Sequence, residues 1–117
     1  MAYEGYPFLD IDPLMKLNIW NKGIMVEGYD PALYRKDICG CWMNFEEHAL
    51  ETEYGWEIDH IVPVGQGGGD ELSNLQPLQW ENNRRKDEIQ GIAQARVTKT
   101  TTHHPKATAH PLKNRKH

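Results

Sequence analysis

The most constraining feature of this 117-residue chain is the stretch of residues 56–63, which reads WEIDHIVP. Bulky apolar residues alternate with polar ones, as in a strand buried on one face, and the closing proline cannot donate to a ladder. We expect Trp56 and Ile58 to face the core. The glycine-rich residues 65–70 then predict a flexible connection, and residues 74–78 a short return strand. Together these segments predict a β-hairpin with a long loop.

A helix is expected directly after this hairpin. From residues 79–80 the chain continues as WENNRRKDEIQGI, which has helical spacing and a stop at Gly91. A second, shorter helix is predicted from the Asp-Pro pair at residues 30–31 to about Gly40, since Asp is a good N-cap and Pro suits the first helical position. Between the two, residues 42–45 alternate like a strand.

The length and low hydrophobic content predict one domain with irregular ends, since only 38% of the residues are hydrophobic. We expect residues 1–33 to wrap the core as irregular structure with short strand-like pieces. Residues 34–95 are expected to form the core, and residues 96–117 a flexible tail. The expected fold class is therefore α+β.

The charge is distributed unevenly along the chain. The net formal charge is −4, yet residues 96–117 contain six Lys or Arg and no Asp or Glu. A basic segment without hydrophobic periodicity is typical of an arm that follows a phosphate backbone. Neither an export signal nor a long apolar run is visible, so we expect a cytoplasmic protein with no membrane contact; delivery as a secreted toxin stays open. Cys39 and Cys41 are too close for an ordinary disulfide, and no role is assigned to them.

Residues 54–87 carry an ordered set of motifs. These are Asp-His-Ile-x-Pro, a Gly-Gly loop, Asn-Leu-x-x-Leu, and an Asn followed by Arg and Lys, at residues 59–63, 67–69, 74–78 and 83–86. In this order they resemble the HNH motif of the ββα-metal nucleases, in a variant whose last letter is Asn. The resemblance implies a small ββα-metal core and the hydrolysis of phosphodiester bonds. The paired Cys-x-x-Cys knuckles of many members are missing, so packing of Trp56, Leu78 and Trp80 must replace them.

The resemblance also implies a role for each matching residue. His60 would be the general base that takes a proton from water, a task that suits neutral imidazole. Asp59 and Asn83 would hold one divalent ion, Mg²⁺ or else Mn²⁺, since both offer hard oxygen donors. Asn74 would brace the loop and orient His60. The neighbouring Asn82 remains an alternative ligand, although the spacing favours Asn83.

Two further expectations concern charge and geometry. Arg84, Arg85 and Lys86 follow the ligand on the helix, and one of them, by preference Lys86, would contact phosphate. Asp59 and His60 are neighbours in a strand and would point to opposite faces, so some distortion at the strand end is expected to bring them together.

The function expected from the resemblance is a DNA endonuclease that leaves 5′-phosphate and 3′-hydroxyl ends, with RNA not excluded as a substrate. The alternative is a non-catalytic nucleic-acid-binding module on the same scaffold, and a weaker one is a structural metal domain. The sequence leaves open whether the protein is a monomer or a homodimer.

Overall fold

The computed structural model describes residues 2–88 and 102–107. In this part of the chain two short antiparallel hairpins combine with two α-helices, which confirms the α+β class. The elements are α1 Pro13–Trp20, β1 Tyr34–Lys36, β2 Trp42–Asn44, β3 Trp56–His60, β4 Leu75–Gln79 and α2 Trp80–Glu88. No helix among the described residues is both long and apolar enough to cross a membrane.

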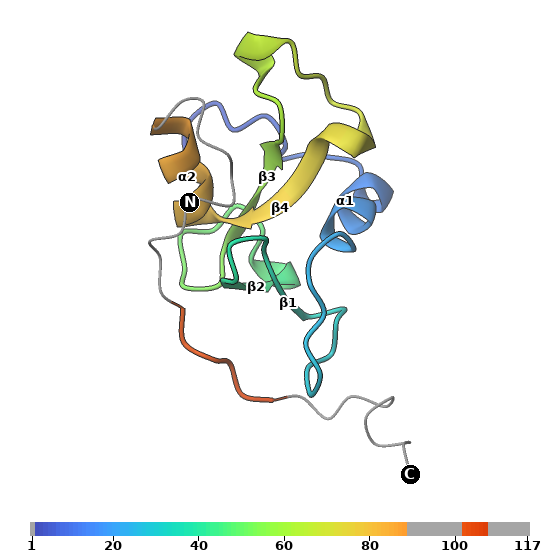
Figure 1. Ribbon diagram of the computed structural model, residues 1–117, viewed down its shortest axis with the longest axis vertical. Coiled ribbons are helices and arrows are strands. Elements are labelled where there is room, and N and C mark those ends of the chain that lie inside the picture. Colours follow the sequence, from blue (N-terminus) through green and yellow to red (C-terminus); the bar gives the residue numbers. More distant parts are fainter. Residues whose placement is uncertain (1, 89–101, 108–117) are drawn as a thin grey trace.

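The predicted hairpin and the helix that follows it form the centre of the molecule. Strands β3 and β4 pair in register from Trp56 opposite Gln79 to His60 opposite Leu75. The ladder continues one residue further, where the Ile61 N–H donates to a backbone carbonyl of the partner segment at 2.8 Å. Helices α1 and α2 lie on opposite sides of this hairpin (Figure 1). Both faces of β3 are therefore covered, where the sequence predicted only one.

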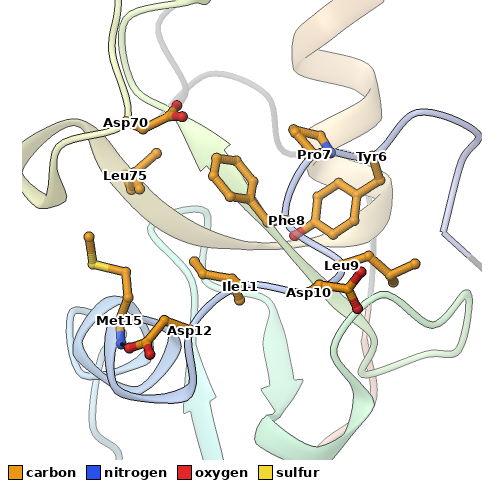
Figure 2. A pocket seen from close by; sticks show the side chains of 10 residues that line it. All are labelled: Tyr6, Pro7, Phe8, Leu9, Asp10, Ile11, Asp12, Met15, Asp70 and Leu75. Atoms are coloured by element: carbon orange, nitrogen blue, oxygen red, sulfur yellow. Dashed lines mark hydrogen bonds between the residues drawn. The ribbon is translucent and has the colours of Figure 1, made fainter.

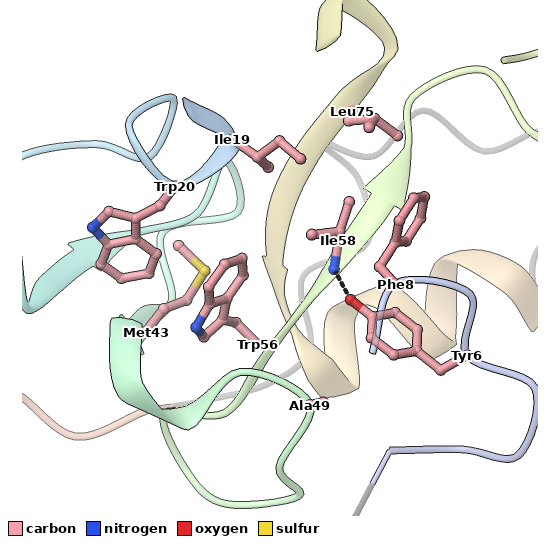
Figure 3. Packing of buried hydrophobic residues seen from close by; sticks show 9 residues of the cluster. All are labelled: Tyr6, Phe8, Ile19, Trp20, Met43, Ala49, Trp56, Ile58 and Leu75. Atoms are coloured by element: carbon pink, nitrogen blue, oxygen red, sulfur yellow. Dashed lines mark hydrogen bonds between the residues drawn. The ribbon is translucent and has the colours of Figure 1, made fainter. Parts of the chain in front are cut away.

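The hydrophobic core lies between β3 and α1. Trp20, Met43 and Trp56 are fully buried there, and the Trp20 and Trp56 rings have centroids 5.1 Å apart (Figure 3). Ile58 also faces this core, as predicted. The Tyr6 hydroxyl accepts a hydrogen bond of 2.6 Å from the Ile58 N–H, which satisfies a strand donor that has no ladder partner on that side.

Helix α1 falls within the segment expected to be irregular. The Asp12 carboxylate accepts hydrogen bonds from the Leu14 and Met15 N–H groups, both at 3.0 Å, and Pro13 takes the first helical turn. These are the N-terminal signals that the sequence analysis applied to residues 30–31 and overlooked here. The irregular segment thus holds one helix, whose buried end contributes to the core.

The helix predicted from residues 30–31 to about Gly40 is wrong. Asp30 does cap a turn, since its carboxylate accepts a hydrogen bond from the Ala32 N–H at 2.9 Å. The chain then extends into β1, which pairs antiparallel with β2. Gly40, at a φ of +87°, lies in the turn between the strands, where glycine adopts a positive φ without strain. Cross-strand pairing therefore overrides the local helix signal.

Residues 102–107 of the predicted tail lie against the body of the protein. The Thr102 hydroxyl accepts a hydrogen bond from the Trp42 N–H at 3.0 Å, and the indole N–H of Trp42 donates to His104 at 3.1 Å. The hydroxyl of Tyr29 donates to the Pro105 carbonyl at 2.8 Å. The rest of the predicted flexible tail lies outside the described residues.

Candidate functional site

A cavity of about 250 Å³ opens at the end of β3, beside α2. Four polar side chains of the motif line it: Asp59, His60, Asn83 and Lys86. Apolar walls surround them, formed by Tyr3, Pro7, Phe8, Ile58, Pro63 and Val64. The structure therefore brings the predicted base and both predicted metal ligands to one space. Strand β3 keeps its register through His60, so the cavity spans the strand end without the expected distortion of the ladder.

The Asp59 carboxylate is buried and engaged at both oxygens. Its Oδ2 accepts a hydrogen bond of 2.9 Å from the amide of Gln76, the residue opposite on β4. Its Oδ1 lies 3.0 Å from the Lys86 ammonium, which also donates to the His60 carbonyl at 2.9 Å. A buried carboxylate needs such partners, and here the Lys86 ammonium balances its charge next to the predicted base.

The His60 imidazole is held by a side chain that the sequence analysis did not single out. Its Nε2 lies 2.7 Å from Asp70 Oδ1, at the end of the glycine-rich loop. The ring also packs against Phe8, with centroids 5.2 Å apart. Both contacts come from segments without regular structure, which is why strand and helix patterns could not reveal them.

Helix α2 places its two consecutive asparagines in different surroundings. The Asn83 amide nitrogen donates to Glu57 at 2.8 Å, which leaves the amide oxygen as the group that can face the cavity. The Asn82 amide instead donates to Asp37 at 2.9 Å, away from the cavity. Glu57 is fully buried on the same face of β3 as Asp59, because residues two apart in a strand share a face.

The three predicted phosphate-binding residues also differ in position. Lys86 lines the cavity but is bonded to Asp59. Arg84 forms ion pairs with Glu51 at 2.7 Å and with Glu57 at 3.1 Å, and its guanidinium lies over a tryptophan ring. Arg85 is half-buried. Only Lys86 of the three therefore borders the predicted base.

Asn74 forms three hydrogen bonds within the loop between β3 and β4. Its side-chain oxygen accepts a hydrogen bond from the Val62 N–H at 2.8 Å, and its amide nitrogen donates to the carbonyls of Val62 and Gly69. These contacts fix the loop that carries Asp70. Asn74 thus reaches His60 through the loop, by way of Asp70.

The donors that meet at the cavity suit a hard divalent ion. Asp59 and Asn83 offer carboxylate and amide oxygens, which Mg²⁺ and Mn²⁺ prefer. Among the described residues no three His, Cys, Asp or Glu side chains gather as a metal site. An ion at this position would therefore take its remaining ligands from water and phosphate.

A second cavity, of about 430 Å³, shares Pro7 and Phe8 with the first (Figure 2). Its charged lining is acidic and consists of Asp10, Asp12 and Asp70. Three carboxylates repel a phosphate backbone, so this cavity does not fit the substrate that the motif implies.

The region of the two cysteines is organised by another residue that the sequence analysis missed. Asp37 is buried and accepts hydrogen bonds from the N–H groups of Cys39 and Cys41, and from the Gln79 N–H at 2.9 Å. Burial, and next the charge of Asp37, raises the pKa of the Cys39 thiol to about 12. The two cysteines form no disulfide, and the hydrogen bonds to Asp37 hold the turn that carries them.

The comparisons with known proteins give one match to a family model. The model of the HNH endonuclease family matches residues 39–88. No curated protein and no solved structure gives a match. The matched range begins at the cysteine turn and ends with α2, so it contains the hairpin, the loop and all the motif residues at the cavity. An HNH domain indicates a nuclease or a nucleic-acid-binding protein.

Proposed function

We propose that the protein is a metal-dependent endonuclease that hydrolyses phosphodiester bonds in DNA, because residues 39–88 match the model of the HNH endonuclease family. One observation carries this proposal: Asp59, His60 and Asn83 line the same cavity. A candidate base and the oxygen donors for an ion are thus side by side, which is the minimal set for phosphodiester hydrolysis.

In this proposal His60 is the general base. With the proton of Nε2 donated to Asp70, Nδ1 is the ring nitrogen that accepts a proton from the attacking water. Packing against Phe8 holds the ring plane, so the accepting lone pair keeps one direction. Asn74 supports this arrangement through the loop that carries Asp70.

Asp59 and Asn83 are proposed to hold one Mg²⁺, for which Mn²⁺ can substitute. Bound there, the ion would neutralise the scissile phosphate and the departing 3′ oxygen, leaving 5′-phosphate and 3′-hydroxyl ends. Glu57 supports this role, because its bond to the Asn83 nitrogen keeps the amide oxygen available. Lys86, with Arg84 and Arg85 on the same helix, is proposed to contact the DNA backbone.

The test is cleavage of supercoiled plasmid DNA in Mg²⁺, in EDTA, and by a His60→Ala variant in Mg²⁺. We expect cleavage only by the unchanged protein in Mg²⁺, with a loss of at least a hundredfold for the variant. Circular dichroism and thermal melting of His60→Ala show whether its fold is intact. Equal cleavage in all three reactions would remove the proposed mechanism.

The same experiment addresses the alternative of a non-catalytic binding module. Such a module would bind DNA with an affinity that falls steeply with salt, and it would cut neither DNA nor RNA in any divalent ion. Cleavage of RNA but not DNA would keep the mechanism and change the substrate.

A further inference from the structure

The Lys86 ammonium lies against Asp59, the carboxylate that is proposed to bind the metal ion. The ammonium lies 3.0 Å from Asp59 Oδ1 and 2.9 Å from the His60 carbonyl. Both side chains of this ion pair are buried, with 7% of Lys86 and 3% of Asp59 exposed. The ammonium thus neutralises the carboxylate that the proposed function assigns to a divalent ion.

We propose that Lys86 competes with the divalent ion for Asp59, and that ion binding releases the Lys86 ammonium toward the DNA phosphate. This inference rests on the proposed function, because it takes Asp59 as a metal ligand. Asp59 Oδ2 is held by the neutral amide of Gln76, so the oxygen that Lys86 holds is the one available to an ion. A single buried carboxylate cannot neutralise an ammonium and a dication together, since the two cations repel one another at short range.

The lysine side chain is suited to such an exchange. Its ammonium is a point charge on a flexible four-carbon stem, so it can leave one partner and reach another without movement of the helix. Lys86 lies three residues after Asn83 on α2, so the released ammonium stays beside the cavity. The ion pair between Lys86 and Asp59 lowers the affinity of the site for the divalent ion. When a DNA phosphate accepts the released ammonium, this affinity is restored. Ion and DNA are therefore expected to bind cooperatively.

The test measures Mn²⁺ binding by isothermal titration calorimetry in the absence of nucleic acid. We expect Lys86→Met to bind Mn²⁺ at least tenfold more tightly than the unchanged protein, and Asp59→Asn to lose binding. Lys36→Met is the matched control, because it removes the same charge from a lysine that lies over the Trp42 ring. This control should bind Mn²⁺ with unchanged affinity.

Thermal melting with and without Mn²⁺ separates competition from a defect in folding. Lys86→Met leaves Asp59 without its counterion, so the variant should melt lower than the unchanged protein without Mn²⁺ and gain more when Mn²⁺ is added. Lys86→Gln keeps a hydrogen-bond donor for Asp59 without the charge, and it should also bind Mn²⁺ more tightly.

Two outcomes would overturn the inference, and they have different meanings. If neither Lys86 variant binds Mn²⁺ more tightly than the unchanged protein, while plasmid cleavage still requires the ion, the competition is refuted and the proposed function stands. If no variant binds Mn²⁺ and no divalent ion supports cleavage, both proposals fail.

Discussion

The orientation of the His60 ring depends on one exposed carboxylate. Asp70 accepts the Nε2 contact at 2.7 Å, and 75% of its side chain is exposed to solvent. An ion pair exposed to this degree contributes little to the free energy of unfolding. Its effect is therefore local, because it selects which ring nitrogen of His60 carries the proton.

We predict that Asp70→Ala lowers the rate of plasmid cleavage about tenfold without a change in melting temperature. The reason is that the Asp70 carboxylate orients the His60 ring and contributes little to stability. The loss should be smaller than for His60→Ala. Glu71→Ala, a change at the exposed neighbour, is the control and should cleave normally. Equal rates for the Asp70 and Glu71 variants would contradict the role of Asp70.

Sequence reasoning could favour Asn83 over Asn82 as the residue at the cavity, but it could not identify the contacts that place each of them. Consecutive helical residues point about 100° apart, so a shift of one position changes the face entirely. The face is set by Asp37 and Glu57, which come from distant segments and hold one amide each. The spacing of the motif favoured Asn83, but neither acidic partner was recognised, because each is an ordinary acidic residue in the sequence.

At the level of elements, the loop between β3 and β4 depends on close backbone contacts. A Cβ atom added to Gly68 would lie 1.7 Å from the Val62 carbonyl oxygen and 2.8 Å from the Asn74 amide nitrogen. Gly65, in the same loop, has open space around the corresponding position. The loop therefore requires glycine at one of these two positions only.

We predict that Gly68→Ala destabilises the protein by roughly 2 kcal/mol or more, because the clash with backbone forces Asn74 from its hydrogen bonds. Gly65→Ala should change the free energy of unfolding by less than about 0.5 kcal/mol. Urea denaturation of both variants provides the measurement. A similar stability for the two would show that the loop relaxes around the added methyl group.

Asp37 joins three elements that the sequence analysis treated as separate. Its carboxylate accepts two hydrogen bonds from the turn between β1 and β2, and one each from the Gln79 N–H at the end of β4 and the Asn82 amide on α2. We predict that Asp37→Ala costs about 3 kcal/mol, since four donors, three of them buried, lose their acceptor. Urea denaturation monitored by tryptophan fluorescence measures this loss. Asp10→Ala, at an exposed aspartate, should leave the midpoint unchanged.

The two Asp-Pro pairs of the chain show why helices were harder to place than the β3–β4 hairpin. Both pairs cap a turn, but only the one at residues 12–13 is followed by residues free to continue as a helix. The pair at residues 30–31 precedes Tyr34, which pairs across to Asn44 on β2. Local capping signals are the same in both places, and the difference lies in contacts between distant residues.

For the whole molecule, the N-terminal segment is tied to the sheet through His48, a half-buried histidine. His48 Nε2 lies 2.9 Å from the Tyr6 hydroxyl, and its ring packs on Trp56 with centroids 4.8 Å apart. The hydroxyl accepts a hydrogen bond from the Ile58 N–H, so its own proton is donated to neutral His48. Burial, and next the charge of Lys16, lowers the pKa of His48 to about 4.

This pairing predicts how stability changes with pH. An unfolded histidine takes up a proton near pH 6.5, whereas folded His48 resists protonation down to about pH 4. Between these values the unfolded chain binds more protons, so the free energy of unfolding falls as the pH is lowered from 6.5 toward 4. The loss is on the order of 2 kcal/mol, and above pH 6.5 His48 contributes no pH dependence.

Urea denaturation at pH 7 and pH 5 tests this prediction with His48→Gln as the comparison. Glutamine offers an amide oxygen to the Tyr6 hydroxyl but does not titrate, so the difference in stability between the two pH values should shrink in the variant. His103, which is exposed, provides the control: His103→Gln should keep the full difference. Carboxylates with lowered pKa values, such as Glu53, lose their contribution mainly below pH 4.5, so they have little effect on the comparison of pH 7 with pH 5. An unchanged difference in His48→Gln would assign the acid sensitivity to other groups.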